Sequence, residues 1–155
     1  MILDIGLDKK DRKLIVDTMV GVLADTVILA LKARNFHWNV VGANFKPLHD
    51  LFQEIYEDLD QAADIQAERI RALGFHCPGS YGEFIAVSSI KEEQGTLEAM
   101  DMIRRIILDI ELLIRRSDEV KVVAMSVNDD ATADVMIERL QSLGKFAWML
   151  RSHLE

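Results

Sequence analysis

The hydrophobic positions of the chain fall into four long stretches with helical spacing. The first recurs in steps of three and four, which places its members on one face of an α-helix. These members are Ile15, Met19, Val22, Thr26, Leu29 and Ala33. The pattern ends near Trp38, where Asn39 and Gly42 open a turn. We therefore expect a long first helix that closes in a tight turn.

The second stretch begins around Pro47, a residue suited to a first helical turn. It stops at Gly74, and the following Pro78 and Gly79 mark the break. Its periodic positions are Leu48, Phe52, Ile55, Leu59, Ala62, Ile70 and Leu73. The spacing predicts a second long helix that runs back along the first.

The segment 80–94 is ambiguous. Its apolar residues can anchor a short connecting helix over the bundle; they are Tyr81, Phe84, Ile85 and Ile90. A third long helix is expected from about Gly95 to about Val122, carrying Leu97, Met100, Ile107, Ile110 and Ile114. After a polar turn at 126–130, a fourth helix runs to the C-terminus with Val135, Leu140, Leu143, Ala147 and Leu150.

These elements predict an all-α fold. Two short connections and one long connection favour a four-helix bundle with a crossover, the ferritin-like arrangement, with a short helix in the crossover. The long helices are expected to exceed twenty-five residues without a breaker, a length that favours a bundle over globin-like packing. Residues 1–155 are expected to form a single domain.

Four residues with metal-binding side chains stand out at two places. His37 closes the first predicted helix and His49 opens the second, so they face each other across the turn of an antiparallel hairpin. Asp64 and Glu68 are four residues apart, which puts both carboxylates on one helix face. Two imidazoles and two carboxylates suit a divalent metal such as iron, manganese or zinc.

The two pairs cannot meet at one metal inside one chain. His49 and Asp64 lie on the same helix about 22 Å apart at its rise per residue, whereas a metal–ligand bond is about 2 Å. Both look out from the same side of that helix, because the residues between them leave an angular remainder of roughly 60°. A two-fold axis across this face would bring the histidines of one chain to the carboxylates of another and create two sites at once.

An alternative is a di-iron site inside one bundle, which needs a Glu-x-x-His on two helices. No histidine here has a glutamate three residues before it, since those positions hold Arg34, Lys46, Leu73 and Leu150. A plainer interpretation stays open. A histidine at a helix end often serves as a cap or hydrogen-bond partner, and the two carboxylates can form a solvated face with Arg69 or Arg71.

Composition limits the possible partners. The chain is 50% hydrophobic and carries a formal net charge of −8, so nucleic acid and membrane binding are disfavoured while cations are attracted. No apolar run approaches membrane-spanning length, and the N-terminus lacks the basic and long apolar regions of a signal peptide. A lone cysteine, Cys77, is compatible with a reducing cytosol, so we expect a cytoplasmic protein.

Three segments together carry a family pattern. They are residues 35–42, which read NFHWNVVG, then Phe45 with Leu48 and His49, and then residues 64–70, which read DIQAERI. They resemble the Dps family of miniferritins, and the spacings of twelve, fifteen and four between the four ligands are those of that family's ferroxidase site. Residues 129–134 and 148–150 resemble the family's final helix, so the similarity spans nearly the whole chain.

The resemblance implies a hollow homo-dodecamer built from two-fold dimers, with a two-iron site at each dimer interface. It implies that Fe²⁺ is oxidised by hydrogen peroxide or O₂ and stored as ferric mineral, which protects against oxidative damage. His37, Asp64 and Glu68 would hold the first iron, and Glu68 would bridge to a second iron that His49 helps to bind. Open coordination positions would admit peroxide and water.

Three further residues acquire roles from the resemblance. Trp38 matches a family tryptophan that intercepts stray oxidising equivalents, although an aromatic packed at the interface accounts for it as well. Asp130 and Asp134 match positions in the three-fold pores through which iron enters, where rings of carboxylates would concentrate Fe²⁺. Acidic residues here can instead cap the last helix or favour its N-terminus. We expect the cap for Asp129 and the pore for Asp134.

Direct DNA binding is not expected. Family members that compact DNA usually carry a lysine-rich tail, whereas the region before the first helix offers only Lys9, Lys10, Arg12 and Lys13 among acidic neighbours. Twelve copies would carry 12 × −8 = −96 formal charges. Two alternatives to a ferroxidase cage stay open: a structural nucleoid protein that protects DNA, and a redox-inactive cage that buffers zinc or manganese.

Overall fold

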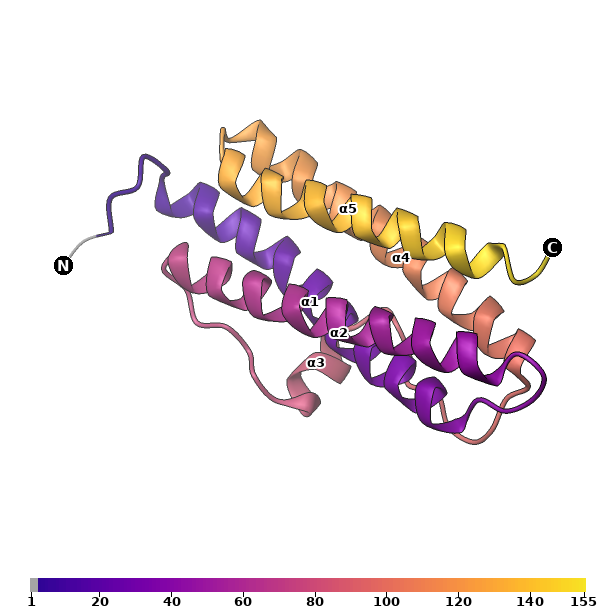
Figure 1. Cartoon of the computed structure of the whole chain (residues 1–155). Coiled ribbons are helices and arrows are strands. Elements are labelled where there is room, and N and C mark those ends of the chain that lie inside the picture. Colours follow the sequence, from indigo (N-terminus) through magenta and orange to yellow (C-terminus); the bar gives the residue numbers. More distant parts are fainter. Residues whose placement is uncertain (1–2) are drawn as a thin grey trace.

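The computed structural model describes residues 3–155, and within this range all regular secondary structure is helical. Four long helices run alongside one another in an elongated bundle, and a short helix lies at its side (Figure 1). Their bounds are α1 Lys9–Asn39, α2 Phe45–Ala72, α3 Tyr81–Val87, α4 Ala99–Ser126 and α5 Asp130–Arg151. The expected four-helix bundle with a short helix in its crossover is confirmed.

Connection lengths determine which helices become neighbours. Residues 40–44 join α1 to α2 and residues 127–129 join α4 to α5, so each pair forms an antiparallel hairpin. Residues 73–98 form the long crossover that carries α3. α1 packs on α2, α4 and α3, and α5 packs on α4 and α2.

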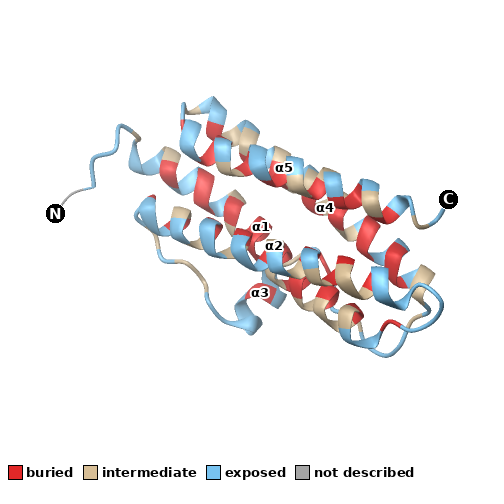
Figure 2. Ribbon diagram, in the orientation of Figure 1, coloured by how far each residue is buried: buried red, intermediate tan, exposed pale blue. Residues whose placement is uncertain are grey.

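The core is built from the predicted apolar faces, which line the inside of the bundle (Figure 2). Every periodic position expected for the first two long helices is buried, with Ile15, Phe52 and Leu59 fully enclosed. Five positions expected for the last two helices are only half-buried: Leu97, Met100, Ile114, Val135 and Leu140. α4 packs on α1 and α5 but not on α2, which leaves part of its surface uncovered.

Two of the predicted helix descriptions need correction. α4 begins at Ala99 rather than near Gly95, because Gly95 has a φ of 85°, outside the helical region, and Glu98 is an extended N-cap. α5 has 22 residues and is therefore shorter than the minimum of about twenty-five that we expected for each long helix.

The basic residues expected before the first helix lie inside its first turns, since α1 begins at Lys9. One of them, Arg12, is buried and donates hydrogen bonds to the carbonyl oxygens of Leu7 and Leu73, the latter at 2.8 Å. Arg12 therefore fixes the start of α1 against the end of α2 and is not part of a flexible basic arm.

The helix α1 contradicts the expectation that no apolar run approaches membrane-spanning length. By length and composition alone it could cross a membrane, so the expectation that no run approaches this length is wrong. In the apolar window of 18 residues that meets this criterion, 67% of the residues are buried in the bundle. Because α2, α3 and α4 all pack on α1, few of its side chains meet water, and its sequence is correspondingly apolar.

The short helix α3 has strong local start signals. Ser80 and Glu83 form a reciprocal capping box, in which each side chain accepts from the other residue's backbone N–H. The hydrogen bond from the Ser80 hydroxyl is the main reason that the pKa of the Glu83 carboxyl lies below its ordinary value. Of the expected anchors of this segment, Phe84 and Ile90 are buried, but Tyr81 and Ile85 are exposed.

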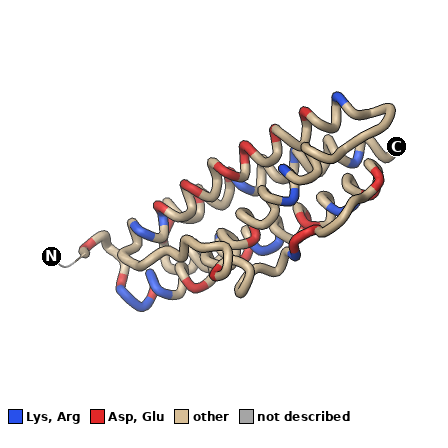
Figure 3. Tube along the Cα trace, turned by 90° about the horizontal axis from the view of Figure 1, so that it is seen from below, with Lys and Arg blue, Asp and Glu red and all other residues tan. Residues whose placement is uncertain are grey.

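Acidic and basic positions are spread along the length of the bundle (Figure 3). The helix α2 carries seven acidic residues against three basic ones. The two candidate carboxylates belong to this helix, whose outer face attracts cations.

Candidate metal centre

The two candidate histidines meet across the α1–α2 turn, as the hairpin geometry predicts. His37 lies in the last turn of α1 and His49 in the first turns of α2. Their imidazole rings are stacked, with centroids 3.8 Å apart and an interplanar angle of 22°. Both side chains are half-buried, so each keeps some access to solvent.

A reciprocal pair of hydrogen bonds fixes both rings. The Nδ1 of His37 lies 2.8 Å from the carbonyl oxygen of His49, and the Nδ1 of His49 lies 2.8 Å from the carbonyl oxygen of His37. Because a carbonyl oxygen can only accept, each Nδ1 must carry the proton and donate it. In a neutral ring the lone pair is then on Nε2, which is the nitrogen that can bind a metal.

Tyr56 supports the His37 ring from the next turns of α2. Its ring packs edge-on against His37, with centroids 5.4 Å apart. The guanidinium carbon of Arg34 lies 4.5 Å from the centre of the Tyr56 ring, a cation–π distance. Arg34 is in turn paired with Asp60. The histidine pair is therefore packed against an ordered polar and aromatic group.

Sequence reasoning missed Tyr56 and Arg34. A signal for Tyr56 was present, because it follows His49 by seven residues and two helical turns bring it to the same face. For Arg34 the equivalent signal was weaker, since its role depends on contacts that cross from α1 to α2.

The two candidate carboxylates lie on the outer face of α2. Asp64 and Glu68 are both exposed, whereas Gln66 between them points into the core and pairs with Thr26. Among residues 3–155, neither carboxylate takes part in a side-chain hydrogen bond or an ion pair. Both carboxylates are solvated, as the plainer interpretation expects, but neither expected arginine pairs with them. Arg69 donates to Thr132 and Asp129, and Arg71 donates to the carbonyl oxygen of Phe75.

The histidine pair and the carboxylate pair do not converge within one chain. In the part of the chain that the structure describes, no group of three or more His, Cys, Asp or Glu side chains is close enough to hold a metal ion. The separation along α2 from His49 to Asp64 corresponds to about 22 Å. One chain therefore presents two separate half-sites, one at the α1–α2 turn and one farther along α2.

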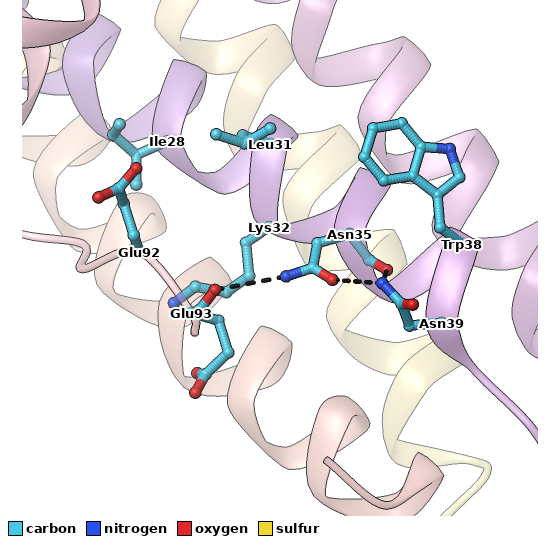
Figure 4. A pocket seen from close by; sticks show the side chains of 8 residues that line it. All are labelled: Ile28, Leu31, Lys32, Asn35, Trp38, Asn39, Glu92 and Glu93. Atoms are coloured by element: carbon cyan, nitrogen blue, oxygen red, sulfur yellow. Dashed lines mark hydrogen bonds between the residues drawn. The ribbon is translucent and has the colours of Figure 1, made fainter. Parts of the chain in front are cut away.

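Trp38 is 64% exposed and lines a surface pocket beside the end of α1 (Figure 4). The opposite wall of this pocket is formed by the crossover residues Glu92 and Glu93. Asn35 ties the two walls together, since its side-chain amide donates to the carbonyl oxygen of Glu93 at 3.3 Å. Within this chain, Trp38 is thus a surface residue next to His37.

The acidic residues at the start of α5 separate into a buried one and two exposed ones. Asp129 is the buried N-cap and accepts from the backbone N–H of Thr132 at 3.1 Å and from Arg69 at 2.7 Å. Burial works to raise the pKa of the Asp129 carboxyl, but hydrogen bonds from Thr132 and Arg69 outweigh burial and hold that pKa below its ordinary value. The predicted cap is confirmed. Asp130 and Asp134 are exposed on α5.

The arrangement of Arg69 connects two candidate regions. Its chain neighbour Glu68 faces outward with the carboxylate half-site, while Arg69 itself donates to Thr132 and Asp129 at the start of α5. Arg69 therefore ties the helix that carries the carboxylate half-site to the start of α5, where Asp130 and Asp134 lie.

A family model for the ferritin-like domain matches residues 19–155. Among curated relatives, a "DNA protection during starvation protein" of Brevibacillus brevis is 35% identical over 133 residues, which cover 86% of this chain and 89% of that protein. A protein of the same name from Helicobacter pylori is 36% identical over 132 residues, covering 84% and 92%.

Solved structures give the same result. A Dps protein from Vibrio cholerae O1, described as a member of a broad superfamily of ferritin-like diiron-carboxylate proteins, superposes with a TM-score of 0.94 at 26% identity and covers 100% of this chain and 98% of that chain. A Dps protein from Bacillus brevis superposes with a TM-score of 0.91 at 32% identity, covering 94% and 98%. The relatives thus share the full length of the bundle with this chain.

Proposed function

The chain belongs to the Dps family of ferritin-like proteins, and from this premise we propose that it forms an iron-storing cage with ferroxidase activity. The observation that carries the proposal is the pair of separate half-sites, one at the α1–α2 turn and one farther along α2. One half presents two imidazoles with free Nε2 atoms, and the other presents two exposed carboxylates. Iron is the substrate of this site and its stored product.

A second copy of the chain completes the site. If two copies pack antiparallel on the α2 face about a two-fold axis, His37 and His49 of one meet Asp64 and Glu68 of the other. Each dimer then holds two equivalent sites. Six such dimers would form the homo-dodecameric cage, which we place in the cytoplasm.

The histidines and carboxylates have different roles at the completed site. His37 with Asp64 and Glu68 of the second copy binds one Fe²⁺, and Glu68 bridges to a second Fe²⁺ that His49 contacts directly or through water. Two Fe²⁺ give up one electron each to one hydrogen peroxide, which takes up two protons and becomes two waters. Because both electrons come from the iron pair, no hydroxyl radical is released; O₂ is the alternative oxidant.

Residues outside the ligand set support this reaction. Asp130 and Asp134 would line the three-fold pores and draw Fe²⁺ inward by their negative charge. Trp38, beside His37, would take up oxidising equivalents that escape the iron pair. Both assignments come from the family resemblance, and the exposure of all three side chains in a single chain is compatible with them.

Stopped-flow measurement of Fe²⁺ oxidation by hydrogen peroxide tests the proposal. We expect His37→Ala combined with Asp64→Ala to abolish rapid oxidation while the cage stays assembled. The matched control, His153→Ala with Asp17→Ala, also removes one imidazole and one carboxylate and should oxidise iron as wild type does. Fast oxidation in the first variant would refute the assignment. Slow oxidation in the wild type would favour a cage that buffers zinc or manganese.

A structural role on DNA is the second candidate, and the name of the curated relatives favours it. The formal charge of −8 per chain opposes it, and so does the placement of Arg12 in the folded helix α1. We expect no DNA retardation in a gel-shift assay at about 150 mM salt without added divalent metal. Retardation that persists under these conditions would revive the DNA role.

A further inference from the structure

Two side chains that can give up an electron lie next to His37. Trp38 follows it in the chain, and the ring of Tyr56 packs edge-on against it with centroids 5.4 Å apart. A third aromatic ring, Phe45, packs against His49 with centroids 5.1 Å apart, but a phenyl ring is much harder to oxidise than an indole or a phenol. An oxidising equivalent that escapes at His37 can therefore be quenched by either Trp38 or Tyr56.

A cation covers the ring of Tyr56. The guanidinium carbon of Arg34 lies 4.5 Å from the centre of that ring, and Asp60 pairs with the guanidinium and holds it there. The Asp60 side chain is 49% exposed, so water screens its charge. Removal of an electron from the ring would create a second positive charge beside the guanidinium, which Coulomb repulsion opposes. Arg34 thus makes Tyr56 harder to oxidise.

Trp38 lies in surroundings of the opposite sign. It lines a surface pocket together with Lys32, Glu92 and Glu93 (Figure 4). Lys32 and Glu93 each have an ion-pair partner on α4. Among the described residues Glu92 has no such partner, so the uncompensated charge in this pocket is negative. A negative charge favours the loss of an electron from a nearby indole.

The two side chains also differ in what their oxidation would damage. Tyr56 packs against the hydrophobic core and supports the ring of His37. Trp38 is largely exposed in a single chain and supports no other ring. Oxidation of Tyr56 would therefore modify the histidine half-site itself, whereas oxidation of Trp38 leaves the packing of His37 intact.

We propose that Arg34 is a specificity-determining residue, whose charge keeps Tyr56 reduced and directs stray oxidising equivalents to Trp38. This inference rests on the proposed function, because the oxidising equivalents arise from iron and hydrogen peroxide at the completed site. Arg34 does not belong to the set of iron ligands. It acts on the ring of Tyr56 through its field.

The electron balance shows when the choice arises. If a site holds only one Fe²⁺, hydrogen peroxide receives one electron from it and needs a second electron to become two waters. The aromatic side chain supplies that electron together with one proton, and solvent supplies the other proton. A neutral indolyl or tyrosyl radical is left. Because tryptophan and tyrosine lose an electron and a proton with similar ease near neutral pH, a difference in nearby charge decides between them.

Two variants separate the charge of Arg34 from its ion pair. Arg34→Met removes the charge but keeps a long side chain over the ring. Asp60→Asn breaks the same ion pair but keeps the cation. If the ion pair served only to hold α1 on α2, both variants would behave alike. We expect instead that only Arg34→Met loses the protection of Tyr56.

Pulse radiolysis with azide radicals tests the charge effect without iron. An azide radical takes one electron from tryptophan and becomes azide anion, and the indole loses a proton to give an indolyl radical. At Trp38 this radical can recover an electron and a proton from Tyr56, which becomes a tyrosyl radical. We expect this conversion, followed by the absorbance of the two radicals, to be slow in wild type and in Asp60→Asn and about tenfold faster in Arg34→Met. Arg34→Met combined with Tyr56→Phe should return to the wild-type rate, which excludes the exposed Tyr81 as the source.

Peptide mass spectrometry after reaction with iron tests the same order at the proposed site. The assembled protein receives one Fe²⁺ per site and excess hydrogen peroxide. We expect oxidation of Tyr56 to be about tenfold greater in Arg34→Met than in wild type, with Asp60→Asn close to wild type. The proposal is overturned if Tyr56 is oxidised equally in wild type and Arg34→Met, or if Asp60→Asn matches Arg34→Met. Arg34→Gln takes the place of Arg34→Met if the latter does not assemble.

The two measurements also separate this inference from the proposed function. Rapid iron oxidation with no effect of Arg34→Met on Tyr56 would sink the role of Arg34 and leave the ferroxidase intact. Slow iron oxidation in the wild type, together with the expected result for azide radicals, would sink the ferroxidase and leave the order of Trp38 and Tyr56 standing.

Discussion

The two halves of the proposed iron site differ in how far a single chain prepares them. The histidine half is fixed, with two rings stacked at 3.8 Å and each Nδ1 bonded to a carbonyl oxygen. The carboxylate half has no such support, and Asp64 and Glu68 are exposed on α2. The fold therefore orients the two imidazoles in advance and leaves the two carboxylates in water.

This division follows from the cost of burial. A neutral imidazole can be partly buried once its N–H is bonded, whereas two adjacent carboxylates without cations are costly to remove from water. Hydrated carboxylates also repel each other weakly, because solvent screens them. In the proposed site, the carboxylate half would be completed only when the imidazoles of another chain and the metal arrive.

The largest effect is expected when the histidine half and the carboxylate half are removed from different chains. One variant carries His37→Ala and His49→Ala, and the other carries Asp64→Ala and Glu68→Ala. Each alone should lack rapid Fe²⁺ oxidation. After dissociation and random reassembly of an equal mixture, about a quarter of the wild-type sites should return, because each mixed dimer keeps one intact site. A mixture as inactive as its components would show that each site is formed within one chain.

Substitutions of Tyr56 test whether packing against the His37 ring helps to orient the histidine half for metal binding. Tyr56→Ala removes the ring that packs against His37, so we expect Zn²⁺ binding, measured by calorimetry, to weaken about 10- to 100-fold. Tyr56→Phe keeps the ring and should bind Zn²⁺ nearly as wild type does. If the phenylalanine variant binds as poorly as the alanine variant, the hydroxyl rather than the packing is responsible.

The stability of the contact between Arg69 of α2 and the start of α5 should depend on pH, because Asp129 takes part in it. Because its folded pKa lies below the ordinary value, its ion pair stabilises the fold above about pH 4 and this contribution is lost as the pH falls through the lowered pKa. Asp129→Asn should lower the free energy of unfolding by about 1–3 kcal/mol near neutral pH. The difference from wild type should shrink in acid-titrated urea unfolding. A difference that stays constant down to about pH 2 would contradict the assignment.

The smallest effect is expected from the carboxylates themselves. Asp64→Asn with Glu68→Gln should change the thermal stability of the metal-free protein by no more than about 0.5 kcal/mol, because both side chains are exposed. His49→Ala should cost about 1 kcal/mol, since it removes a hydrogen bond and the ring stack. Equal losses in the two variants would show that both halves are prepared alike.

Local patterns in the sequence predicted the helices and the meeting of His37 with His49. Both depend on short-range geometry: helical periodicity sets the faces, and a turn of five residues, 40–44, brings the two rings together. The separation of the histidine and carboxylate pairs also followed from helix length alone. The N-cap role of Asp129 was readable because caps lie within a turn of the residues they bind.

Contacts between distant segments were not predictable in the same way. The bonds from Asp25 to the Ser88–Ile90 segment and to Arg116 join residues more than sixty positions apart, and nothing in local spacing pairs them. The exposed positions of Tyr81 and Ile85 were missed because periodicity shows that a face is apolar but not what covers it. The length of the apolar run in α1 was missed because isolated polar residues such as Asp25 and Thr26 interrupt it.

The enclosure of α1 by three other helices has a consequence for the synthesis of the chain. α1 is complete at Asn39, but α4, which covers one of its sides, ends at Ser126, so 126 − 39 = 87 further residues must be made first. At about 5–20 residues per second, this takes roughly 4–17 s. During that time a helix apolar enough for a lipid bilayer emerges from the ribosome with part of its surface bare. Newly made chains should therefore be clients of ribosome-associated chaperones, and a stall before α4 should produce aggregates.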